Sequence, residues 1–133
     1  MSKNNFLRIL SFFIFPASVF IFSEFIAIAF NAYQVYPWID IPIHFLGGFA
    51  IAYMAILFFR FFKEKNLLDI KNKAIFVLLV VALVVFIAVL WEFYQFLKFY
   101  FFGFVLSPLQ DALLDFFMGL SGGLVGGIVF RKV

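Results

Sequence analysis

Long apolar segments alternate with short polar ones along this chain. Residues 74–90 carry no polar side chain at all. A helix needs about 20 apolar residues to cross ~30 Å of hydrocarbon, and the apolar segments have about that length. The pattern predicts an all-α, polytopic membrane protein, in which four transmembrane helices form a compact antiparallel bundle and a single membrane domain. The expected spans are residues 6–31, 38–59, 74–97 and 108–130, with a solvated loop at 60–73.

Local signals predict where these helices begin and end. Asp40 followed by Pro42 is typical of a helix start, with an acceptor for free N–H groups and proline in the first turn. Ser107-Pro108 has the same character. Residues 98–104 are too aromatic for an aqueous loop, and we expect a connector in the membrane interface. The first apolar run of about 20 residues is longer than the ~7–15 of a secretory signal, which predicts a retained helix.

Composition supports this class and narrows the partners. With 67% hydrophobic and 13% charged residues, the chain is unlike a soluble domain. The absence of cysteine excludes disulfides and thiolate metal sites. The net charge of +3 resides at the ends of apolar spans, so we expect no nucleic-acid partner. All lysines and arginines except Lys98 fall on one side of the predicted topology, which predicts a multi-pass cell-membrane protein with both termini and loop 60–73 cytoplasmic.

Acidic and imidazole groups gather in the outer half of the predicted bundle. Glu92 ends the apolar third span, where a charged group costs roughly 2.5–3.5 kcal/mol on insertion scales, so a functional role is the default interpretation. Asp40 and His44 share a helix face with small residues, and so do Asp111 and Asp115. Such faces pack closely against other helices. We therefore expect an acidic, His-containing cleft open to the outer leaflet. Its candidate site residues are His44, Glu92, Asp115, Asp111 and Asp40.

Structural explanations compete with this interpretation. Asp40 is also the residue type of a helix cap, and Asp111 suits a helix amino terminus through the helix dipole. His44 alone is compatible with ordinary hydrogen-bonded packing. Glu24, within the first span, is either protonated or paired with His44. The glycines that continue the Asp115 face are expected to serve packing.

The order of these motifs resembles the VanZ-like and YjdF-like families of small membrane proteins. The resemblance rests on Asp40-Ile41-Pro42-Ile43-His44-Phe45, on Glu92-Phe93-Tyr94-Gln95, and on Asp111-Ala112-Leu113-Leu114-Asp115 before a glycine ladder. VanZ-like proteins often have Lys where this chain has Ile41, and Asp115 is closer to the YjdF-like pattern than to the Asn of many relatives. The resemblance implies a bacterial or archaeal envelope protein, of a type linked in some members to glycopeptide-antibiotic resistance.

Three classes of function fit the sequence, and it leaves open whether the protein is an enzyme. The first is binding or processing of a lipid or cell-envelope intermediate, with membrane lipids and a lipid-linked substrate as partners. In that case His44, Glu92 and Asp115 share protons or hold a divalent metal such as Zn or Mn. No serine or cysteine adjoins His44 in sequence as a nucleophile. The second is a small dimeric transporter using Glu24 and Glu92, and the third is a non-catalytic accessory protein.

Overall fold

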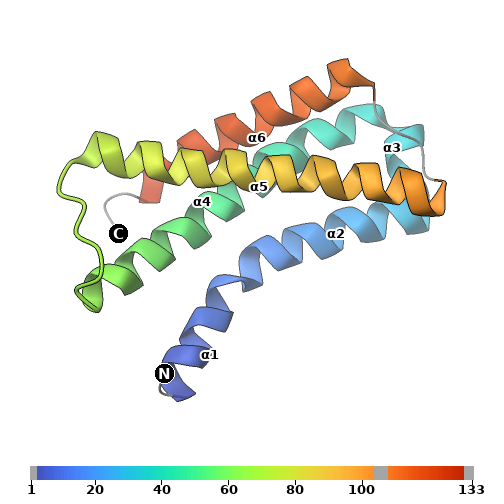
Figure 1. Ribbon diagram of the computed structural model, residues 1–133. Coiled ribbons are helices and arrows are strands. Elements are labelled where there is room, and N and C mark those ends of the chain that lie inside the picture. The colour runs from blue at the N-terminus through green and yellow to red at the C-terminus, as the bar shows by residue number, and fades with distance from the viewer. Residues whose placement is uncertain (1–2, 104–107, 131–133) are drawn as a thin grey trace.

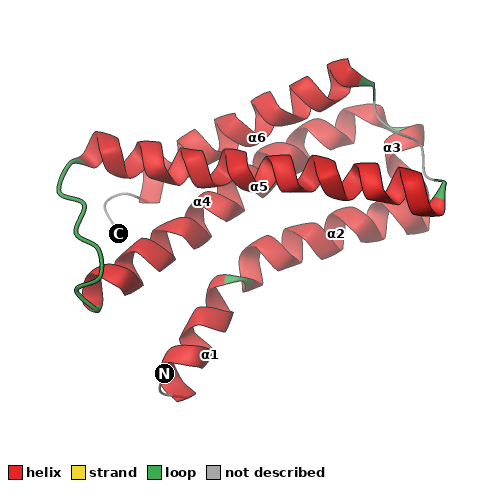
Figure 2. Ribbon diagram, viewed as in Figure 1, coloured by secondary structure: helices red, strands yellow, loops and turns green. Residues whose placement is uncertain are grey.

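The computed structural model describes residues 3–103 and 108–130, and its regular structure within them is entirely helical (Figure 2). The prediction of an all-α protein is confirmed. Three helices are long and apolar enough to span a membrane, and a bent pair makes a fourth candidate span in this part of the chain. The elements are α1 (Lys3–Phe12), α2 (Ile14–Phe30), α3 (Ala32–Val35), the 3₁₀ turn η1 (Pro37–Ile39), α4 (Asp40–Glu64), α5 (Lys73–Phe102) and α6 (Leu109–Phe130).

The helices α4, α5 and α6 pack against one another, and α1 and α2 form an arm that lies against α4 (Figure 1). The start of α1, the end of α6 and the α4–α5 loop lie at the same end of the molecule. An antiparallel, multi-pass arrangement follows. The assignment of that end to the cytoplasm stays a prediction, and Arg131 and Lys132, which contributed to it, lie outside the described residues.

The predicted first span is one continuous helix over residues 6–31, and the structure corrects this. The helix ends at Phe12, α2 begins at Ile14, and the two are bent by 42°. Pro16 explains the break, because it has no N–H to donate to the carbonyl of Phe12 and its ring crowds that carbonyl. The first candidate span is therefore a bent arm.

Two other helices run further than the sequence pattern predicted. The second extends to Glu64 and the third to Phe102, so the solvated loop shortens to 65–72 and most of the 98–104 connector is helical. The first break after residue 98 is Gly103, whose φ of 68° closes α5 in the left-handed region. Asn72 caps the start of α5, where its side chain accepts from the N–H groups of Ala74 and Ile75. The predicted cap Ser107 lies outside the described residues.

Glycines set the contact between α4 and α6, which is the most extensive helix pair in the bundle. A Cβ on Gly48 would overlap the backbone carbonyl of Gly119, and a Cβ on Gly122 would overlap that of Phe45. Gly123 serves a different neighbour, since its Cβ would lie 2.9 Å from Val84 of α5. The glycines thus serve packing as predicted, but they divide between two helices instead of forming one face.

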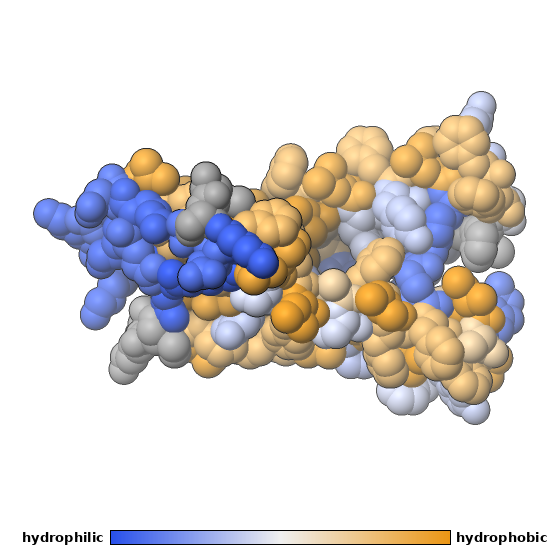
Figure 3. All heavy atoms as spheres, turned by 90° about the horizontal axis from the view of Figure 1, so that it is seen from below, coloured by the Kyte–Doolittle hydropathy of each residue, from blue (hydrophilic) through white to orange (hydrophobic). Residues whose placement is uncertain are grey.

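The surface fits a lipid environment. Large hydrophobic side chains are widely exposed, for example Phe22 at 55% and Phe102 at 75%. Hydrophilic side chains gather at the end that holds the α4–α5 loop, hydrophobic ones cover the middle, and a smaller hydrophilic area lies toward the other end (Figure 3). At the loop end, Arg8 pairs with Glu64, and Arg60 donates to the carbonyl of Phe130 at 2.8 Å. These bonds tie α1 and α6 to α4.

Candidate functional site

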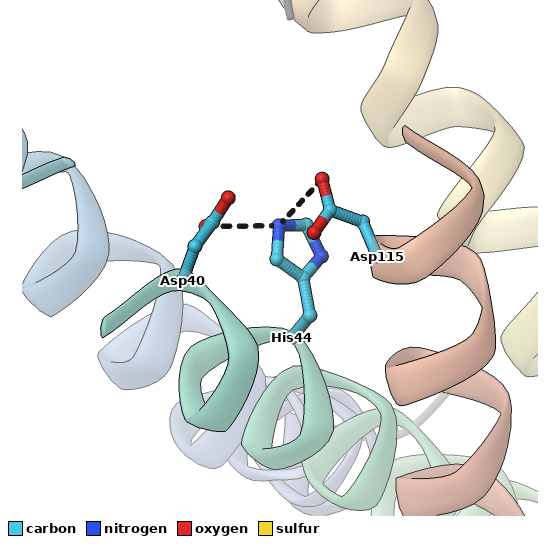
Figure 4. Close-up of side chains that lie close together, drawn as sticks. All are labelled: Asp40, His44 and Asp115. Atoms are coloured by element: carbon cyan, nitrogen blue, oxygen red, sulfur yellow. Dashed lines mark ion pairs between the residues drawn. The ribbon is translucent and has the colours of Figure 1, made fainter. Parts of the chain in front are cut away.

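The side chains of Asp40, His44 and Asp115 converge near the end of the bundle opposite the α4–α5 loop (Figure 4). The His44 Nε2 atom lies 3.2 Å from Asp40 Oδ1 and 3.5 Å from Asp115 Oδ2. Asp115 is 5% exposed and the His44 side chain 13% exposed. We call these three residues the Asp–His–Asp group.

Helix geometry and close packing build this group. Asp40 and His44 are four residues apart on α4, so they occupy one face in consecutive turns. Asp115 comes from α6. Its position along the helix axis relative to His44 is set by the close contact of Gly119 with Gly48, which lies one turn further along each helix. Asp40 is the first residue of α4 and makes no capping hydrogen bond, so its interpretation as a helix cap is wrong. Its carboxylate pairs with His44 instead.

One ring nitrogen faces two carboxylates, which limits what the group can do. Nε2 carries at most one hydrogen in either charge state of the ring, so it can donate fully to only one carboxylate at a time. The positive charge of an imidazolium, a proton on one of the carboxylates, or a cation between the three side chains would compensate the second carboxylate. The group is therefore suited to holding a positive charge or transferring a proton, the two roles that His and carboxylates share in catalytic sites.

Two cavities meet at this group. A polar cavity of about 740 Å³ lies among α2, α3, α4, α5 and α6, and its lining includes Asp40, Asp111 and Lys98. An apolar cavity of about 360 Å³ extends from the group toward Met54, between α2 and the helices α4 and α5. Four residues line both cavities: Ser23, His44, Trp91 and Asp115. The Asp–His–Asp group thus lies where a polar chamber opens onto an apolar one.

The other two candidate site residues lie near the group without joining it. Glu92 lines the apolar cavity together with His44 and Asp115, so it faces the bundle. It forms no ion pair within the described ranges, and Asp40 takes the third place that we expected for Glu92 in the convergent set. Asp111 is exposed and lines only the polar cavity.

Glu24 has a partner that the sequence interpretation missed. Its carboxylate binds Lys98 Nζ at 3.0 Å, not His44, and both side chains are about four-fifths buried. Because α5 continues to Phe102, Lys98 lies a full turn inside the helix and faces α2. Of the two alternatives for Glu24, the pair with His44 is therefore wrong. Lys98, the single basic residue placed on the outer side, was the signal that could have identified this pair.

Three further polar groups in the cavity walls also escaped sequence reasoning. The hydroxyls of Ser23 and Tyr33 share a hydrogen bond of 2.6 Å, and burial raises the pKa of Tyr33 to about 12. Ser23 is a hydroxyl near His44 that local sequence did not reveal, although its bond is to Tyr33. The indole Nε1 of Trp91 is buried and has no hydrogen-bond partner among the described residues.

Comparison with known proteins places the chain in a family. A family model described as predicted membrane protein (DUF2238) matches residues 2–133. The chain belongs to the DUF2238 family. This membership supports a membrane protein, and it does not single out the VanZ-like or YjdF-like families that the motifs resemble. The search of curated proteins found no match to this DUF2238 member. The search of solved structures also found none.

Proposed function

We propose that this DUF2238 protein binds or processes an amphiphile, a lipid or a cell-envelope intermediate, at the Asp–His–Asp group. The observation that carries the proposal is the meeting of a polar and an apolar cavity at His44 and Asp115. An amphiphile needs this combination, with its headgroup in the polar chamber and its hydrocarbon chain in the apolar one. The distribution of basic residues favours entry from the outer leaflet.

The apolar cavity has the character of a chain-binding site. Its volume of about 360 Å³ falls within the ~300–1,000 Å³ of ligand pockets. Its wall consists mainly of apolar side chains, with His44, Glu92 and Asp115 as the charged exceptions. A hydrocarbon chain there would replace contacts with lipid by contacts with protein. The headgroup would then lie against the charged exceptions.

The chemistry available at the headgroup is proton transfer or electrostatic stabilisation. His44, flanked by Asp40 and Asp115, has the partners that orient and stabilise an imidazole acting as acid or base. Glu92 lies in the same cavity wall and offers a second carboxylate. One imidazole with carboxylates also suits a divalent cation such as Zn or Mn.

The resemblance to VanZ-like and YjdF-like proteins agrees with an envelope role and remains part of this proposal. A dimeric transporter using Glu24 and Glu92 has less support, because Glu24 is already neutralised by Lys98. An accessory role would leave the cavities without a ligand. The measurement below separates it from the amphiphile proposal.

A cavity-filling variant tests the proposal. Gly47 lines the apolar cavity, and a Cβ added to it meets no atom within 4 Å. Gly47→Leu should therefore fill the cavity without straining the backbone. We expect wild-type protein purified in mild detergent to retain a defined lipid class by mass spectrometry, and Gly47→Leu to lose most of it. Ala29→Leu on the exposed side of α2 is the matched control. Equal lipid retention in all three proteins would overturn the proposal.

A further inference from the structure

We propose that Asp40, His44 and Asp115 bind one divalent cation of the zinc type, with an open coordination position that faces the cavities. The inference deepens the proposed function, on which its substrate class rests: a cation in this place selects an amphiphile with an anionic headgroup, such as a phosphate. The geometry of the three side chains and the cavity wall beside them support the cation site itself.

Two of the three separations between donor atoms match those around a tetrahedral metal. Ligands ~2.0–2.2 Å from zinc at tetrahedral angles lie ~3.3–3.6 Å from one another. His44 Nε2 is 3.2 Å from the Asp40 oxygen and 3.5 Å from the Asp115 oxygen. All three side chains offer ligand atoms within 4.8 Å of one another, so a small rotation of one carboxylate completes the site. Charge-assisted hydrogen bonds are shorter, ~2.7–2.9 Å.

The number and type of ligands favour an open site. Zinc sites that act on substrates hold three protein ligands and leave the fourth position to water or substrate. Here α4 supplies two ligands and α6 the third, and the remaining direction belongs to the cavities that His44 and Asp115 line. Two carboxylates with a neutral imidazole carry a net charge of −2, which a divalent cation balances.

Trp91 provides an independent pointer to a bound oxyanion. Its Nε1 is a donor only, is buried, and has no acceptor within residues 3–103 and 108–130. Buried donors nearly always have a partner, so such an atom calls for an explanation. The Trp91 ring lies 6.3 Å from the His44 ring between centroids and lines both cavities. A headgroup oxygen on the cation is a candidate acceptor for this N–H.

The competing explanation is an ion pair alone, with a protonated His44 between two carboxylates. In that case the group needs no metal and His44 carries the charge. The two explanations differ in a direct measurement, because only the first predicts saturable binding of a cation.

The test is titration of the full-length protein in dodecyl maltoside with ZnCl₂ and, separately, MnCl₂, after treatment with a chelator. We expect about one zinc per chain by calorimetry and by elemental analysis. Asp40→Asn, His44→Gln and Asp115→Asn should each weaken binding at least about tenfold. Asp69→Asn, in the α4–α5 loop, is the control, since this carboxylate lines neither cavity and lies outside the convergent group, and it should bind zinc within about twofold of wild type.

Melting temperatures show whether each variant is folded. Zinc should raise the melting temperature of the wild type and of Asp69→Asn but not of His44→Gln. Absence of saturable zinc and manganese binding, or equal binding by His44→Gln, would overturn the inference. Lipid retention by chelator-treated wild type against Gly47→Leu is measured in parallel. If the wild type retains lipid but binds no zinc, the cation site is refuted and the proposed function stands. If the wild type binds zinc but Gly47→Leu retains as much lipid as the wild type, the proposed function is refuted and the cation site stands.

Discussion

Lys98 Nζ lies 3.0 Å from Glu24 Oε1, and this pair joins the C-terminal half of α2 to α5. Lys98 also lies over the Tyr94 ring, 5.0 Å from its centroid. Between α2 and α5 the wall of the apolar cavity continues toward the bend near Phe13. Glu24 and Lys98 themselves line the polar cavity, so the ion pair joins the arm to α5 at the edge of the polar cavity.

Removing one partner of this pair should cost more than removing both. Glu24→Gln or Lys98→Met leaves a largely buried charge without its counter-ion, and we expect a loss of about 1–3 kcal/mol in the free energy of unfolding. The double variant should recover most of that loss. A double-variant cycle from unfolding in mixed micelles measures the coupling. Additive losses would show that the pair does not stabilise the bundle.

The glycines of the α4–α6 contact should differ sharply in their tolerance of a methyl group. Gly48→Ala places a Cβ into the carbonyl of Gly119, so we expect a loss of about 1–3 kcal/mol or more as the helices separate. Gly47→Ala, its neighbour, meets no atom within 4 Å and should be neutral or stabilising by up to about 1 kcal/mol. Thermal unfolding in detergent compares the two. Similar melting temperatures would contradict the close approach of the helices.

Asn72 should contribute to stability as the amino-terminal cap of α5. Its side chain accepts from Ala74 and Ile75, so Asn72→Ala removes both bonds and should cost about 1 kcal/mol. Asn72→Asp keeps an acceptor and should restore most of the loss. The free energy of unfolding of the three proteins provides the comparison. A loss of the same size in Asn72→Asp would indicate that the cap is not what stabilises this end.

Tyr33 should make the protein less stable at high pH. Its folded pKa is about 12 against an ordinary value of 10, mainly because burial disfavours the phenolate. The folded state therefore binds the proton more tightly, its advantage is intact below pH 10, and stability falls as the pH rises from 10 to 12. Tyr33→Phe should lower stability at neutral pH through loss of the Ser23 bond, yet flatten this decline. Melting temperatures from pH 8 to 11.5 test it, and parallel curves would refute it.

The sequence predicted the helical class because long apolar segments leave the backbone no other way to satisfy its hydrogen bonds in lipid. It predicted that Asp40 and His44 share a face because that follows from helix periodicity alone. It did not predict that Asp40, and not Glu92, joins His44 and Asp115, because helix rotation and height depend on contacts such as Gly48 with Gly119. Hydropathy also did not predict the end of α5 at Phe102, because aromatic residues are compatible both with a helix and with a connector in the membrane interface. For the same reason the sequence did not predict the ion pair of Lys98 with Glu24.

The contacts at the two ends of α4 and α6 have a mechanical consequence. Asp115 meets His44 at one end, Arg60 holds the carbonyl of Phe130 at the other, and backbone meets backbone between them. These three contacts along α4 and α6 restrict both the sliding and the rotation of one helix against the other. The bent arm is joined to the other helices by the Arg8–Glu64 and Glu24–Lys98 ion pairs, so a motion of the arm would have to break these pairs. If the proposed amphiphile enters beside the arm, the arm moves while the three contacts between α4 and α6 stay in place.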